Sequence, residues 1–169
     1  MSKTQLKKEL KELDAPQLRE LILEVYEARK EAREYFEFFL APDADKLYQR
    51  YVTLIDKELL RSKRGMLSAR FTRVRAFIKD FASFGPGADY VLRLMQHTLS
   101  VAVVAERAYH TKPPFENGIL RLAADTLTYA DRHLLFDSAL KSVTEITDTQ
   151  ASRHLAPALR DVIEQHMGQ

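Results

Sequence analysis

An apolar stretch near the middle of the chain restricts most strongly what this sequence can fold into. It runs from Tyr90 to Tyr109 (YVLRLMQHTLSVAVVAERAY) and would be apolar on nearly all sides of a helix. Helices of this kind are usually buried on most sides. Its charge-free part, Leu94 to Ala105, is shorter than the roughly 18 residues that span a bilayer. We therefore predict a central core helix over about 88–110, and not a membrane span.

Small side chains recur along the same stretch, at Ser100, Ala102, Ala105 and Ala108. Such residues let neighbouring helices approach closely, because little side-chain volume separates the two backbones. We therefore expect Ala102 and Ala105 to be buried against partner helices, with the rest of the chain packed around this element.

Length and composition favour one soluble domain. The chain has 169 residues, 46% of them hydrophobic, which suffices for a sizeable core within a single domain over residues 1–169. It contains no cysteine, which excludes disulfides, thiolate nucleophiles and metal sites built on cysteine. The first residues lack the apolar core of a signal peptide, since Glu9 and Glu12 interrupt it. We therefore expect a cytoplasmic location.

Two helices are predicted before residue 42. Leu6, Leu10 and Leu13 recur at helical spacing and predict a short opening helix. A long second helix is predicted over 14–40, because one apolar stripe continues through this range and Asp14 has capping-box spacing to the glutamine three residues later.

Six further helices follow from the same 3.6-residue period. They are a third from Asp43 or Asp45 to near Gly65, a fourth over about 67–84, the central helix, a sixth over about 115–135, a seventh from Asp137 or Ser138, and a last one from Asp148 or Thr149, with Pro157 as a kink or as its true start. Alternating β-branched runs and Asn-Gly or Asp-Gly turns are absent, so no sheet is predicted. The predicted fold class is all-α, with about seven to eight antiparallel helices in a bundle or an irregular helical-hairpin array.

Two segments resemble a known family. They are LKKELKELDAPQLRELILEVYEARKEAREYFEFFL at the start and FIKDFASFGP before the central apolar helix. Both are similar to an uncharacterised bacterial family of small all-helical proteins, described only as a domain of unknown function. The resemblance is clearest over 6–40 and 77–110. It implies an all-helical soluble protein and supplies no catalytic or binding residues.

Positive charge is concentrated in one part of the sequence, which we call the basic tract (residues 57–79). Eight basic residues stand there against Glu58 alone, a net charge of +7. These candidate phosphate or acidic-partner contacts are Lys57, Arg61, Lys63, Arg64, Arg70, Arg73, Arg75 and Lys79.

The basic tract has two interpretations, which the sequence leaves open. A cluster of this kind can neutralise phosphates, and arginine suits bidentate phosphate contacts. Helical geometry puts Arg75 and Lys79 on one flank of the fourth helix and Arg70 and Arg73 on the other. The two flanks join only if the turn over 61–64 bridges them. Otherwise the tract is a solvated surface whose charges are paired locally.

Histidine and carboxylate residues offer a weaker signal for a metal. Glu106 and His110 are four residues apart, as are His133 and Asp137, so each pair can share a helix face. Two such pairs brought together would resemble a metal site. Pairs at this spacing are also common surface ion pairs, and no His-Glu-x-x-His motif is present. We expect no metal and no other cofactor, and expect His97 to be a hydrogen-bonded core or edge residue.

The sequence lacks the motifs of the common catalytic and nucleotide sites. Gly-x-Ser-x-Gly, the P-loop and Gly-x-Gly-x-x-Gly are all absent. We therefore expect a non-enzymatic helical interaction or scaffold module with a protein partner and no membrane, and self-association is compatible with this. The alternative is binding of nucleic acid or an acidic partner through the basic tract, and a distant third is a metal-dependent enzyme.

Overall fold

The chain folds into helices in two compact units. The computed structural model describes residues 1–63 and 66–168, except for the side chain of Lys63. Over these residues the fold is all-α, with nine helices and one two-residue strand pairing. The two units are Met1–Asp43 and Ala44–Gln169. The expectation of a single domain stays a prediction.

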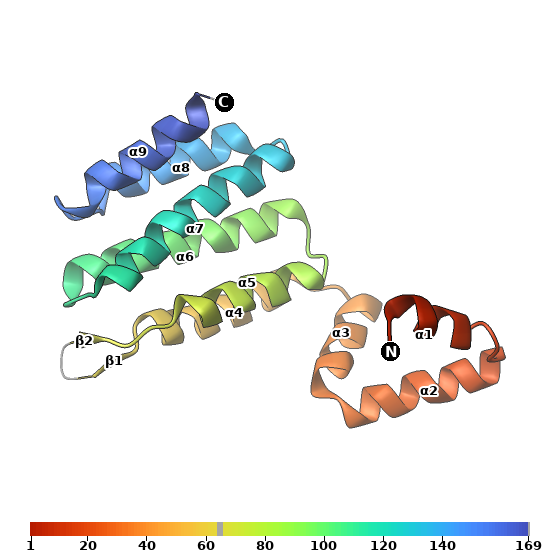
Figure 1. Cartoon of the computed structure of the whole chain (residues 1–169). Coiled ribbons are helices and arrows are strands. Elements are labelled where there is room, and N and C mark those ends of the chain that lie inside the picture. The colour runs from red at the N-terminus through yellow and green to blue at the C-terminus, as the bar shows by residue number, and fades with distance from the viewer. Residues whose placement is uncertain (64–65, 169) are drawn as a thin grey trace. The chain divides into compact units, whose positions relative to one another are not determined.

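The N-terminal unit contains α1 (Lys3–Glu9), α2 (Ala15–Ala28) and α3 (Lys30–Leu40) (Figure 1). The predicted capping box is confirmed at the start of α2. Asp14 Oδ1 accepts the Gln17 N–H at 2.8 Å, and the Asp14 N–H donates to Gln17 Oε1 at 2.9 Å. None of the residues in these three described helices is buried. A unit of this size encloses too little apolar surface for a core of its own.

The prediction of one long helix over 14–40 is wrong. Arg29 is extended, with φ −131° and ψ 118°, and separates α2 from α3. Beyond the break, the Arg33 guanidinium turns back onto the end of α2. Its Nη2 donates to the Glu27 carbonyl at 3.4 Å, and its central carbon lies over the Tyr26 ring, 5.4 Å from the ring centroid. A cation on the last carbonyls of a helix stabilises that end. The break therefore has a contact that holds it, although no proline or glycine marks it.

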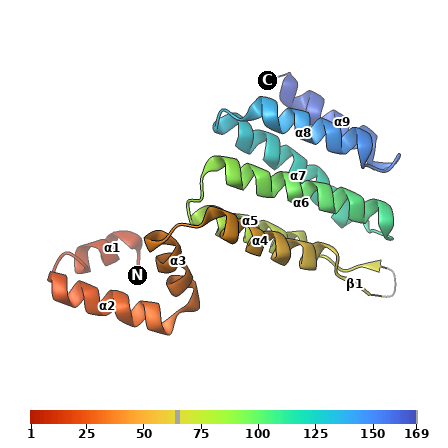
Figure 2. The ribbon, with the colours of Figure 1, turned by 180° about the vertical axis from the view of Figure 1, so that it is seen from behind.

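Six helices form the C-terminal unit in two layers. α4, α6 and α8 lie in one layer and α5, α7 and α9 in the other, and each consecutive pair packs as a hairpin (Figures 1 and 2). The six helices are α4 (Ala44–Leu59), α5 (Phe71–Ser83), α6 (Ala88–Ala108), α7 (Pro113–Arg132), α8 (Phe136–Thr149) and α9 (Leu155–Met167). They correspond to the third to the last of the predicted helices. The described helices therefore exceed the predicted seven to eight because the second one is divided.

A short hairpin precedes α5, which the sequence did not predict. β1 (Ser62–Lys63) pairs antiparallel with β2 (Met66–Leu67). Strands of two residues are too short to show an alternating pattern. The hairpin also explains why α5 begins at Phe71 and not near residue 67. The predicted end of the preceding helix at Gly65 lies outside the described residues.

The predicted central helix is confirmed as α6. Leu94, Leu99, Ala102 and Ala105 are fully buried, and the helix packs against α4, α5, α7 and α8. Val104 remains 48% exposed, so the helix keeps one free strip. None of the helices in the described part of the chain is long and apolar enough to cross a membrane.

The buried side of α6 leaves no room for a larger side chain at residue 102. Ala102→Leu is expected to lower the free energy of unfolding by about 1–3 kcal/mol, because inserted methylenes force neighbouring helices apart. Urea denaturation measures this. Val104→Leu on the exposed strip is the matched control and should change stability by less than about 0.5 kcal/mol. Equal effects of the two substitutions would contradict the packing described for α6.

Candidate functional site

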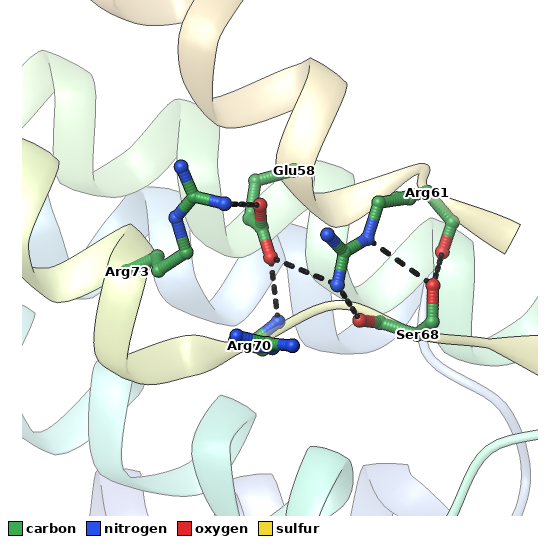
Figure 3. Close-up of polar contacts among 5 residues, drawn as sticks. All are labelled: Glu58, Arg61, Ser68, Arg70 and Arg73. Atoms are coloured by element: carbon green, nitrogen blue, oxygen red, sulfur yellow. Dashed lines mark hydrogen bonds and ion pairs between the residues drawn. The ribbon is translucent and has the colours of Figure 1, made fainter.

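A buried carboxylate organises much of the basic tract. Glu58, near the end of α4, is 5% exposed. Its Oε2 lies 3.4 Å from Arg73 Nη1, and its Oε1 lies 3.7 Å from Arg61 Nη2 (Figure 3). Oε1 also accepts the backbone N–H of Arg70 at 3.0 Å, directly before α5. Glu58 therefore neutralises part of the tract and fixes the start of α5.

Arg61 is held a second time, by Ser68. Its Nη2 donates to the Ser68 carbonyl at 2.6 Å, and its Nε lies 3.2 Å from Ser68 Oγ (Figure 3). The Ser68 hydroxyl and N–H in turn donate to the Arg61 carbonyl at 3.1 and 2.8 Å. These bonds close the base of the hairpin. Arg61 is thus engaged within the protein and does not present its full donor set to a ligand.

The other residues of the tract are dispersed. Lys57 is exposed on α4, whereas Arg70 and Lys79 are exposed before and along α5. Arg75 Nη2 donates to Asp125 Oδ2 of α7 at 2.7 Å. The side chain of Lys63 and all of Arg64 lie outside the described residues, so the predicted bridge over 61–64 stays a prediction.

A groove with basic side chains runs between α5 and α7, which we call the α5–α7 groove. It consists of two cavities that share Arg75. The Arg121 cavity has a volume of about 450 Å³ and lies at the first turn of α5. The Tyr129 cavity has a volume of about 420 Å³ and lies over the second half of α5. The groove brings Arg121 and Arg132 of α7 beside the residues of the basic tract.

The Tyr129 cavity combines an apolar floor with a charged rim. Ile78, Val91, Met95 and Leu122 line it and are buried, whereas Arg75, Lys79, Arg132 and Asp125 contribute the charges. Burial raises the pKa of the Tyr129 phenol, and the nearby charge of Asp89 raises it further. The phenol therefore stays protonated at neutral pH and can donate a hydrogen bond. A floor and rim of these kinds suit a ligand that is apolar on one side and acidic at its edges.

The contribution of α7 was missed from the sequence, although a signal was present. Arg121, Asp125 and Arg132 are spaced by four and seven residues and so lie on one helix face. Their significance depends on α5 lying opposite that face, which periodicity within one helix does not reveal.

The histidine and carboxylate pairs are not brought together. Glu106 is buried and accepts a hydrogen bond from the Ser152 hydroxyl at 3.1 Å. His133, directly after α7, contacts the ring of Tyr129. In the part of the chain that the structure describes, no three His, Asp or Glu side chains form a metal-binding group. His97 is half-buried, and its Nε2 lies 2.8 Å from Asp56 Oδ1, as predicted for an edge residue.

Comparison with known proteins identifies a family without assigning an activity. No curated protein and no solved structure matches the chain. The sequence model of a family of unknown function (DUF6155) matches residues 1–156 and so most of the chain. This confirms the resemblance to a family of unknown function, which was clearest over 6–40 and 77–110, whereas the bacterial origin stays a prediction. The chain therefore belongs to this family of unknown function, DUF6155.

Proposed function

We propose that this protein is a non-enzymatic interaction module, built as an array of antiparallel helical hairpins, that binds an acidic amphipathic helix of a partner protein. The binding site is the α5–α7 groove. The observation that carries the proposal is the Tyr129 cavity, where an apolar floor lies beneath a rim with an excess of cations. A cytoplasmic location and self-association remain predictions.

The charges on the rim favour an acidic ligand. Asp125 neutralises Arg75, to which it is bound at 2.7 Å. Lys79 and Arg132 are exposed and add two more positive charges, so that the rim keeps a net charge of +1 when the nearby carboxylate of Asp89 is included. An amphipathic helix lays its apolar face into such a groove through side chains at positions i, i+3, i+4 and i+7. Acidic residues beside that face would meet Lys79 and Arg132, which adds specificity and speeds association.

Two observations favour a protein helix over nucleic acid. The floor of the Tyr129 cavity offers apolar surface, which a sugar–phosphate backbone does not use. Arg61 and Arg73, two of the predicted phosphate contacts, share the carboxylate of Glu58. Binding of nucleic acid requires several cations free to replace counterions along the backbone. Nucleic acid is therefore the alternative ligand in the experiment below.

A synthetic helix with leucine at every third or fourth position and glutamate elsewhere tests the proposal by fluorescence anisotropy. The double substitution Lys79→Glu and Arg132→Glu is expected to weaken its binding about tenfold or more, since two attractive charges become repulsive. Lys57→Glu is the control, because Lys57 is also an exposed lysine of the basic tract but lies outside the groove. It should change the affinity by less than about twofold at moderate salt.

The same measurement contains the outcomes that count against the proposal. A probe with lysine in place of glutamate must bind much more weakly than the acidic probe. If both probes bind equally, the rim does not select acidic ligands. If single-stranded or duplex DNA binds tightly while the acidic helix does not, the nucleic-acid alternative replaces the proposal.

A further inference from the structure

The Arg121 cavity collects positive charge from two segments that are far apart in the sequence. Arg70 precedes α5, Arg75 lies one turn into it, and Arg121 comes from α7. No acidic residue lines this cavity among the residues that the structure describes. Guanidinium groups that surround one cavity without a carboxylate are arranged for an anion, because each presents a fork of donors that matches phosphate or carboxylate oxygens.

The three arginines of the cavity differ in their contacts, and a contact orients the guanidinium of Arg75. The backbone N–H of Arg70 is bonded to Glu58, which leaves its exposed guanidinium at the cavity. Arg75 is oriented by Asp125 through Nη2, and its Nε is enclosed without a hydrogen-bond partner in the described part of the chain. Arg121 is exposed and, over the same residues, makes no ion pair. Three guanidinium groups and the carboxylate of Asp125 leave a net charge of +2 at this end of the groove.

The start of α5 also favours a negatively charged ligand. Arg70 precedes the helix and makes no side-chain capping hydrogen bond. The first amides of an α-helix have no intrahelical acceptor, and the helix dipole adds partial positive charge there. Phe71 and Thr72, the first two residues of α5, line the cavity beside the arginines. Amide groups at such a position bind anions well.

Aromatic side chains form the remaining wall. The Phe71 and Phe115 rings meet edge to face, with their centroids 5.1 Å apart, and Phe115 is buried. The Phe71 ring occupies the place where a Cβ of residue 118 would lie, so Gly118 is what allows this close approach to α7. The cavity volume of about 450 Å³ falls within the range of small-molecule sites. The cavity can thus hold an anionic group together with its carrier, the apolar or aromatic part of the ligand to which that group is attached.

We infer that the Arg121 cavity binds a phosphomonoester dianion. A phosphomonoester carries about −1.5 to −2 charges at neutral pH, which matches the +2 of the three arginines and Asp125. Its three terminal oxygens accept from guanidinium forks and from the first amides of α5, whereas a carboxylate has two oxygens and one charge. The carrier packs on the aromatic wall. This site does not rest on the proposed function, because Arg121 and Arg132 belong to different cavities.

Phenyl phosphate is the probe, titrated by calorimetry and followed by amide NMR shifts at the start of α5. It is expected to bind at millimolar or lower concentration. Arg121→Gln should weaken it about tenfold, since a charge-assisted hydrogen bond is lost. Arg132→Gln, an exposed arginine on the same helix that lines the other cavity, should change its affinity by less than about twofold. Benzoate, with the same ring and a single charge, should bind more weakly than phenyl phosphate.

The possible outcomes identify the source of the phosphate group, and they show whether this inference or the proposed function is wrong. A phosphotyrosine peptide that binds more tightly than phenyl phosphate identifies a phosphorylated protein as the source. If the phosphotyrosine peptide does not bind while phenyl phosphate does, the source is a small phosphorylated molecule. No binding of phenyl phosphate at millimolar concentration, equal binding of benzoate, or equal losses in both variants would overturn the inference. If the acidic helix fails to bind while phenyl phosphate binds, the proposed function alone is wrong.

Discussion

Replacing Phe81 with alanine is expected to lower the free energy of unfolding by about 3–5 kcal/mol, as measured by urea denaturation. The side chain is fully buried. Its ring centroid lies 5.3 Å from that of Tyr51 and 6.4 Å from that of Tyr48, both on α4. The substitution removes these aromatic contacts and leaves a cavity between α4 and α5, which the rigid helices around it fill only in part.

Phe77 gives the matched control one helical turn away. It has the same side chain on the same helix, but it is only half-buried and lies under the guanidinium of Arg73. Phe77→Ala should cost about 1 kcal/mol. If both substitutions destabilise the protein equally, then Phe81 is not the contact that joins α4 to α5.

The periodicity of apolar residues predicted most of the core of the C-terminal unit. Val74, Ile78 and Phe81 follow the same helical spacing that predicted the fourth helix, and all three are buried. Ala102 and Ala105 were predicted to be buried because small residues allow close helix packing, and both are confirmed. Such predictions succeed where the local pattern and the tertiary contact agree.

Two features of the fold have no local pattern that would predict them. The break at Arg29 contains no proline or glycine, and Arg33 reaches back to α2 from beyond it. The pairing of β1 with β2 is supported by Arg61 and Ser68, which bond to each other directly beside the two strands. In both cases the stabilising contact is made by a side chain whose position is known only after folding.

The candidate site could be predicted only in part, for the same reason. The charge of the basic tract was visible in the sequence, and Arg70, Arg75 and Lys79 do line the groove. The partners on α7 were not predicted, because the packing of α5 and α7 on α6 brings together residues about fifty positions apart. Glu58 appeared as a single opposing charge, and its burial between two arginines could not be read from composition.

Loss of the Glu58 carboxylate is expected to produce the second large effect on stability. Removing one partner of a buried ion pair costs about 3–5 kcal/mol. Here the side chains of Arg73 and Arg61 are 54% and 40% exposed, so water compensates part of the loss. The backbone N–H of Arg70 also loses its acceptor. We therefore expect Glu58→Ala to lower the free energy of unfolding by about 2–4 kcal/mol in urea denaturation.

Glu58→Gln separates the hydrogen bond from the charge. The glutamine Oε1 can still accept the Arg70 N–H, so this variant should lose about half as much stability as Glu58→Ala.

The Glu58→Gln substitution also removes the charge that Arg61 and Arg73 share, and so it frees both cations toward solvent. If the basic tract binds nucleic acid, the variant should bind DNA more tightly and with a steeper salt dependence than the wild type. If the α5–α7 groove is the binding site, affinities for the acidic helix and for phenyl phosphate should stay within about twofold, because neither cavity includes Glu58. A variant that gains DNA binding and loses the acidic helix would place the function of this protein on the basic tract and not in the groove.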